Sequence, residues 1–179
     1  KWRRLTGQWS AARAFAVPWQ ALTHPVTAFL LHAAAIWVWH LPSLYDATVS
    51  SEVMHAAQHA SFVVTALLFW WVVLRPSPAR GGTAVAIGLL FGTVMHTDAL
   101  SAVLTLSSRL LYTVYATTTQ PWGLAPIEDQ QVGGLIMWVP GGLAYVVAAL
   151  ALVVRLFRES EQRVARREAA AEDTWTGFR

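Results

Sequence analysis

Cysteine is absent from this 179-residue chain, and charged side chains are scarce. Without thiols there is no disulfide framework and no thiolate metal site, so any bound metal must rely on histidine, methionine or carboxylate ligands. Charged residues make up 13% of the chain, about half of the roughly 25% found in soluble globular proteins. These absences exclude a disulfide-stapled protein and disfavour an ordinary soluble domain.

Sequence signatures of catalysis are also missing. The chain has no pattern that pairs a nucleophile with a base, no phosphate-binding loop and no catalytic pair of carboxylates. We therefore expect that the protein is not an enzyme. Its start at Lys1 rather than at methionine leads us to expect a processed or truncated piece of a longer protein.

Hydrophobic residues are abundant, at 55% of the chain, and they fall in long blocks. A transmembrane helix needs about 20 mostly apolar residues. The sequence therefore predicts an all-α, polytopic transmembrane bundle with four spans. The expected spans are residues 25–41, 51–74, 83–106 and 132–157. A short loop should join the first two spans after Leu41-Pro42, because proline ends a helix. Residues 107–130 should form a long connection that does not cross the membrane.

Basic residues decide the expected orientation. If the spans alternate in direction, twelve of the thirteen basic residues lie on one side of the membrane, and only Arg109 lies on the other. Basic loops stay in the cytoplasm, so both termini are expected there. Residues 1–18 are basic and aromatic, which is typical of a segment that lies on anionic membrane lipids rather than one that binds nucleic acid. Residues 158–179 should form a charged cytoplasmic tail.

Histidines gather near the outer ends of these spans. His40 ends the first span, His55 and His59 begin the second one helical turn apart, and His96 lies in the outer half of the third. Ionisable groups in a membrane are costly and usually functional. Since imidazole suits copper, zinc and iron, we interpret the four histidines as candidate metal ligands. Hydrogen bonding between helices and proton transfer are the alternatives.

Other polar residues near the cluster have two interpretations each. Met54 and Met95 each adjoin a histidine, so they either complete a copper site or simply pack. His32 lies about two turns deeper than His40 and is either a deep ligand or an interhelical donor. Asp98 is expected to orient a histidine or to tie two helices together.

Glu128 and Asp129 precede the fourth span on the same side. They either form an entry point for a metal ion or cap the helix, since carboxylates are favourable at helix N-termini.

Three stretches resemble the CtaG family of bacterial cytochrome c oxidase (caa3-type) assembly factors. They are W-H-L-P-S-L-Y-D at 39–46, H-A-A-Q-H-A-S-F at 55–62 and E-D-Q-Q-V-G-G-L-I-M-W-V-P-G-G at 128–142. The similarity covers residues 24–157 and corresponds to a C-terminal four-span part, since family members usually have more spans. Positions that match the family's motifs include His40, His55, His59 and Asp129. They also include Asp46 and Gln130.

The resemblance implies a multi-pass protein of the bacterial inner membrane that helps to assemble a heme-copper oxidase, with oxidase subunits as partners. Its histidine cluster would handle copper on the periplasmic side. Two alternatives stay open. The chain is either a structural, non-catalytic subunit of a larger respiratory or photosynthetic membrane complex, or a membrane protein that binds heme through facing histidines.

Overall fold

The protein is described by a computed structural model that covers residues 14–176, with side chains described to residue 172. Every regular element in this part of the chain is a helix. A helix over 14–22 precedes α2, and the remaining elements follow in chain order. They are α2 (Pro25–Trp39), α3 (Pro42–Ser50), α4 (Glu52–Leu74), η1 (Pro78–Arg80), α5 (Gly82–Leu106), η2 (Thr113–Thr117), η3 (Gln120–Trp122) and α6 (Pro126–Thr176).

Three helices are long and apolar enough to cross a membrane: α4, α5 and α6. Helix α2 has fifteen residues and is about 22 Å long, shorter than the roughly 30 Å hydrocarbon core. It meets helix 14–22 at a bend of 65°, and the two count as a fourth candidate span only when taken together. The chain is thus a multi-pass membrane protein with three or four candidate spans. Most of the expected surface segment 1–18 lies outside the described residues.

The helix starts follow local signals. Ser51 caps α4, because its side-chain oxygen accepts a hydrogen bond from the backbone N–H of Met54 at 3.4 Å. Pro42 stands in the first turn of α3, where its missing N–H costs nothing. The loop expected between the first two spans is therefore wrong: Pro42 ends one helix and begins another, the nine-residue α3.

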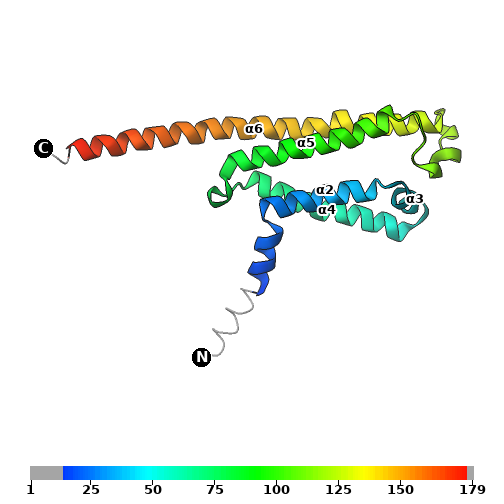
Figure 1. Cartoon of the computed structure of the whole chain (residues 1–179), viewed down its shortest axis with the longest axis horizontal. Helices are drawn as coiled ribbons and strands as arrows, with labels where there is room; N and C mark the ends of the chain where they lie inside the picture. The colour runs from blue at the N-terminus through cyan, green and yellow to red at the C-terminus, as the bar shows by residue number, and fades with distance from the viewer. Residues whose placement is uncertain (1–13, 177–179) are drawn as a thin grey trace, which may run out of the picture.

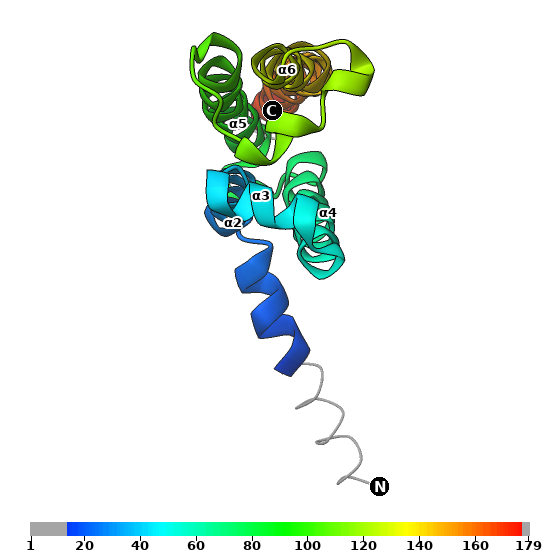
Figure 2. The same ribbon diagram turned by 90° about the vertical axis from the view of Figure 1, so that its right-hand side faces the viewer.

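The long helices form two antiparallel pairs, α2 with α4 and α5 with α6, which lie side by side (Figures 1 and 2). Helix α3 and the 107–125 connection lie at one end of the bundle, which we call the α3 end. The turn at 75–81 lies at the opposite end, which we call the tail end because α6 extends beyond the bundle there (Figure 1). We call the corresponding halves of the bundle the α3 half and the tail half.

The pair α5–α6 meets closely at one glycine. A Cβ built on Gly134 would lie 2.9 Å from the backbone N of Thr105 and would overlap the Thr105 side chain. In the middle of α5, a Cβ on Gly92 would lie 3.2 Å from the Phe29 ring of α2. At Gly88, one turn earlier, a Cβ would meet no described atom within 4 Å. Close packing therefore uses Gly92 and Gly134, and Gly88 takes no part in it.

The apolar core lies in the tail half, where both helix pairs contribute to it. Its buried members are Phe69 and Val73 of α4, Ala86 and Leu90 of α5, and Leu152 of α6. Phe69, Val73 and Leu90 are at most 1% exposed. This cluster joins the two pairs, so the tail half is a conventionally packed bundle.

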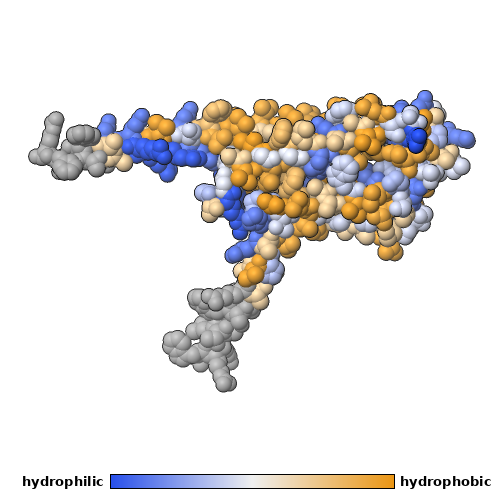
Figure 3. Space-filling model, in the orientation of Figure 1, coloured by the Kyte–Doolittle hydropathy of each residue, from blue (hydrophilic) through white to orange (hydrophobic). Residues whose placement is uncertain are grey.

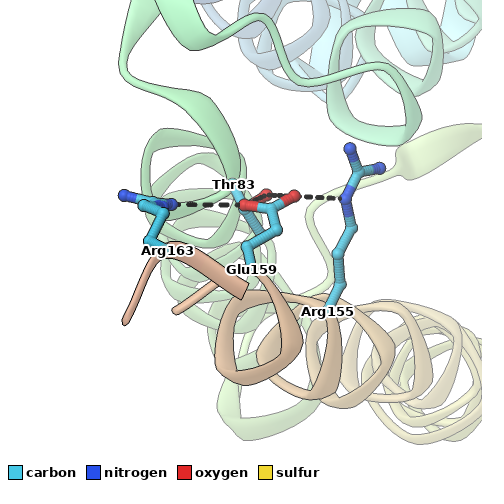
Figure 4. Close-up of polar contacts among 4 residues, drawn as sticks. All are labelled: Thr83, Arg155, Glu159 and Arg163. Atoms are coloured by element: carbon cyan, nitrogen blue, oxygen red, sulfur yellow. Dashed lines mark hydrogen bonds and ion pairs between the residues drawn. The ribbon is translucent and has the colours of Figure 1, made fainter. Parts of the chain in front are cut away.

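A polar cluster fastens α6 to the start of α5 at the tail end (Figure 4). The Thr83 hydroxyl donates to the Glu159 carboxylate at 3.0 Å, and Arg155 donates to the same carboxylate at 2.8 Å. Arg163 forms a second ion pair with Glu159 at 3.6 Å. Helix α6 runs without interruption from the apolar region into the polar tail, and Figure 3 shows hydrophilic residues gathered along the part that extends beyond the bundle.

Candidate functional site

An exposed pair of imidazoles marks the first two turns of α4. His55 and His59 lie one turn apart on the same helix face, and their ring centroids are 4.5 Å apart at an interplanar angle of 50°. Both residues are exposed. Two imidazoles presented side by side can bind one metal ion and leave its other coordination positions open to outside ligands.

His40 stands at the C-terminal end of α2 and is separate from that pair. Its Nδ1 lies 2.7 Å from the carbonyl oxygen of Ile36, and its ring lies 6.5 Å from the ring of Phe62 on α4. A carbonyl oxygen only accepts hydrogen bonds, so Nδ1 carries the proton. The lone pair of the neutral ring is therefore on Nε2.

His40 borders a cavity of about 160 Å³, which we call the α3-end cavity. Three tyrosines from α3 and the 107–125 connection form one wall, and the first turns of α6 form another. The residues that line it are His40, Tyr45, Leu104, Tyr112, Tyr115, Asp129, Gln130, Gly133, Gly134 and Met137.

Ring contacts and hydrogen bonds join the three tyrosines. The Tyr45 and Tyr112 rings are stacked with centroids 3.9 Å apart, and the Tyr45 and Tyr115 hydroxyls lie 3.4 Å apart. The Tyr112 hydroxyl donates to the carbonyl of His40 at 3.1 Å. Burial raises the pKa of Tyr112 to about 12, and burial together with the Tyr115 hydroxyl raises the pKa of Tyr45 further. Both phenols therefore stay protonated at neutral pH and act as hydrogen-bonding groups.

The three acids near this cavity have different roles. Glu128 caps α6, because its carboxylate accepts the backbone N–H of Ala125 at 2.9 Å. Asp129 lines the cavity. Asp46 accepts from the Thr113 hydroxyl at 2.8 Å through Oδ2, while its buried Oδ1 has no hydrogen-bond partner among the described residues.

Gln130 holds the 107–125 connection in place. Its side-chain oxygen accepts from the backbone N–H of Leu111 at 2.7 Å, and its side-chain nitrogen donates to the carbonyl of Arg109 at 3.2 Å. The residue is 6% exposed. Its amide is thus committed to backbone groups, as buried polar side chains generally are.

A second, more open cavity of about 300 Å³ lies between the two helix pairs, farther from the α3 end, and we call it the inner cavity. Its polar and sulfur-bearing lining residues are His32, His40, Thr97, Met137 and Tyr145. Ile36, Phe62, Ala66 and Gly141 complete the lining. His40 and Met137 line both cavities, so they stand at the boundary between them.

His32 links three helices at the inner cavity. Its Nδ1 lies 3.3 Å from the Thr65 hydroxyl on α4, and its Nε2 lies 3.5 Å from the Tyr145 hydroxyl on α6. Its ring stacks on Phe69 with centroids 5.2 Å apart. These contacts correspond to the expected interhelical role, and they leave the expected ligand role untested.

His96 lies on α5 and makes its contacts with residues of α2. Trp37 donates its indole N–H to His96 Nδ1 at 3.3 Å, and the His96 ring packs edge-on against Phe29. Since Nδ1 accepts, the proton of the neutral ring is on Nε2, which is buried without a partner among the described residues. Met95 beside it is 56% exposed. Asp98 on α5 and Met54 on α4 are partly buried.

The four predicted ligands therefore occupy three places: the α4 face, the boundary between the cavities and α5. No three histidine or acidic side chains within residues 14–172 come together as a metal site. The sequence interpretation missed Met137, whose position could have been found from spacing. Gly133, Met137, Gly141 and Tyr145 recur every four residues, which places them on one face of α6.

Comparison with known proteins identifies a family and several relatives of this chain, but no solved structure that resembles it. The family model described as cytochrome c oxidase caa3 assembly factor (Caa3_CtaG) matches residues 2–159. An uncharacterized protein of Mycobacterium bovis and one of Mycobacterium tuberculosis are each 33% identical over 156 residues, and one of Mycobacterium leprae is 28% identical over 158 residues. Each match covers 86% of this chain, which spans 23–24% of the length of these relatives. No solved structure matches the chain.

Proposed function

The chain belongs to the Caa3_CtaG family of cytochrome c oxidase caa3 assembly factors, and from this premise we propose that it handles copper for the oxidase at the α3 end of its bundle. The copper ion is cargo, received and passed on. The exposed pair of His55 and His59 is the observation that carries the proposal. Oxidase subunits and membrane lipids are its proposed partners.

The geometry of the pair suits transfer better than storage. Two ligands on an exposed helix face leave the remaining coordination positions for a donor or an acceptor protein. A closed site of four ligands would retain its ion. Copper is favoured among divalent metals at nitrogen ligands, because affinity rises along the first row to Cu²⁺ and falls at Zn²⁺.

Charge supports the proposed side of the membrane. Arg75 and Arg80 lie in the turn at the tail end, and α6 carries further arginines past the bundle. By the positive-inside rule we place the tail end in the cytoplasm of a bacterial cell, and the α3 end on the periplasmic side of its inner membrane. The exposed pair of His55 and His59 would then lie on the periplasmic side.

The proposal is tested by the paired variant His55→Ala/His59→Ala. We expect copper binding by the detergent-purified chain to weaken by roughly tenfold or more, since even an outer-shell partner of a metal ligand is worth 10–100-fold in affinity. Oxidase activity should fall in cells that make the variant. His24→Ala is the matched control, because His24 is an exposed histidine at the other end of the bundle. Unchanged copper and oxidase levels in the paired variant would overturn the proposal.

A structural role in a larger respiratory or photosynthetic complex is the second candidate. In this alternative the histidines hold the helices together, as the contacts of His32 do when they tie α2 to α4 and α6. A structural subunit would co-purify with its complex in a fixed ratio and without copper. A transient assembly factor would be recovered largely free of the finished oxidase.

A further inference from the structure

The inner cavity is lined by two further histidines and a methionine, side chains that can bind a metal ion and that are not part of the exposed pair. We propose that it is a second copper site, in which Cu(I) binds Nε2 of His32, Nε2 of His40 and the thioether sulfur of Met137. All three residues line the cavity. This inference rests on the proposed function, because it requires that the chain receives copper.

The hydrogen bond of His40 leaves a nitrogen free for a metal. Its Nδ1–H is held by the Ile36 carbonyl at 2.7 Å, so the lone pair is on Nε2. Histidines that bind metals usually donate their other ring N–H in this way, which fixes the tautomer and the orientation of the ring. Because His40 lines both cavities, it is placed to meet an ion that comes from the α3-end cavity.

The hydrogen bonds of His32 fix the same tautomer. Thr65 donates its hydroxyl proton to the Ser61 carbonyl at 2.8 Å, so its oxygen accepts from His32 Nδ1 at 3.3 Å. The lone pair of His32 is then on Nε2, whose one hydrogen-bond partner within the described part of the chain is the Tyr145 hydroxyl at 3.5 Å. A contact of this length is a weak hydrogen bond, and a metal ion can displace it.

His96 has the opposite arrangement, although it was a candidate ligand from the sequence. Its Nδ1 lone pair accepts the Trp37 indole N–H, which leaves a protonated Nε2. It would have to break that bond or change tautomer to bind a metal. The hydrogen bonds thus leave a lone pair on Nε2 for a metal ion at His32 and His40, but not at His96.

The ligand set favours Cu(I) over divalent ions. Thioether sulfur is a soft donor that selects Cu(I), whereas magnesium, calcium and manganese prefer oxygen. Among the described residues that line the inner cavity, none carries a carboxylate to offset a double positive charge. Burying an uncompensated charge between apolar walls is costly, and the Born cost rises with the square of the charge. A monovalent soft ion therefore fits this site best.

The two cavities together form a path along which an ion could move from the α3 end into the bundle. An ion from the α3 end would pass Asp129 in the first cavity and then reach His40 and Met137, which line both cavities. Together with His32, whose ring stacks on the fully buried Phe69, these two residues would hold the ion in the inner cavity. The path thus leads from the α3 end to the apolar core and ends there.

Copper X-ray absorption on the full chain in detergent, loaded with Cu(I) under reducing conditions, tests the inference. The chain has no cysteine and three methionines, so any sulfur ligand is a methionine. The measurement uses the His55→Ala/His59→Ala background, which removes the exposed pair. We expect this variant to lose the copper of the exposed pair and to retain Cu(I) with a sulfur neighbour in the inner cavity, and the addition of Met137→Leu to abolish the sulfur signal. Leucine has a similar volume, so the helix packing is kept.

Met95→Leu is the control, because Met95 is exposed on α5 and lines neither cavity. His32→Gln in the same background should reduce the number of nitrogen neighbours and weaken Cu(I) binding. Failure of the His55→Ala/His59→Ala chain to bind Cu(I), or a sulfur signal that survives Met137→Leu, would overturn the inner site and leave the exposed pair intact. Failure of the unmodified chain to bind copper at all would overturn both proposals.

Discussion

The tail half and the α3 half of the bundle differ in what lies between the two helix pairs. In the tail half the pairs meet through an apolar core that includes Phe69 and Leu152. In the α3 half they are separated by two cavities lined by histidines, tyrosines and a methionine. The polar residues that the sequence suggested as functional lie mainly in the half that is not filled.

The difference indicates that one half of the bundle provides stability and the other provides space for a ligand. Close packing supplies stability, because each buried side chain gains many small contacts. A cavity gives up part of that stability and provides space for a ligand. The Phe69 ring stands at the boundary, since it belongs to the core and also stacks on His32.

The sharpest test of this comparison replaces one phenylalanine in each half of α4. Phe69→Ala should lower the free energy of unfolding by about 3–5 kcal/mol, because it leaves a void in a filled core. Phe62→Ala should cost clearly less, since Phe62 is partly buried and already faces the inner cavity. Unfolding of the detergent-purified chain by denaturant measures both values. Equal losses would contradict the difference in packing.

A second, smaller effect on stability should show that α5 and α6 pack closely against each other in the α3 half. The cavities of this half lie between the two helix pairs. Gly134→Ala should lower the stability by about 1–3 kcal/mol, since the new methyl group would overlap Thr105 on α5. Gly133→Ala is the matched control. A Cβ there meets no described atom within 4 Å, so alanine should be neutral or stabilise the helix by up to about 1 kcal/mol.

Thermal unfolding of the two glycine variants in the same detergent gives the comparison. If Gly134→Ala is as stable as Gly133→Ala, the close approach of α5 and α6 at this level is wrong.

Local signals in the sequence predicted much of the helical framework. Ser51 is a residue type that favours helix N-caps and Glu52 follows it in the first turn, and in the structure Ser51 caps α4. Pro42 was interpreted only as the end of a helix, although proline is equally favourable in a first turn. Glu128 had two interpretations, and its bond to Ala125 places it in the capping role.

The arrangement of the histidines was harder to predict, because it depends on rotation about each helix axis. Sequence position gives the depth of a residue in the membrane, and by depth His40, His55, His59 and His96 belong together. Apolar residues surround the later turns of α4, so no polar stripe shows which face turns inward. Only the packed structure shows that His55 and His59 face outward while His40 faces the cavities.

The smallest expected effect concerns the tail end, where a polar cluster rather than packing fastens α6 to α5. Glu159→Gln should slightly lower the melting temperature, because the neutral amide loses both arginine ion pairs and weakens the hydrogen bond from Thr83. The difference from the unmodified chain should shrink as salt is added, since partly exposed ion pairs are screened. Glu161→Gln is the control, because it makes the same charge change at an exposed position two residues along α6. An equal loss in both variants would mean that net charge, and not the contact with Thr83, sets the stability of this end.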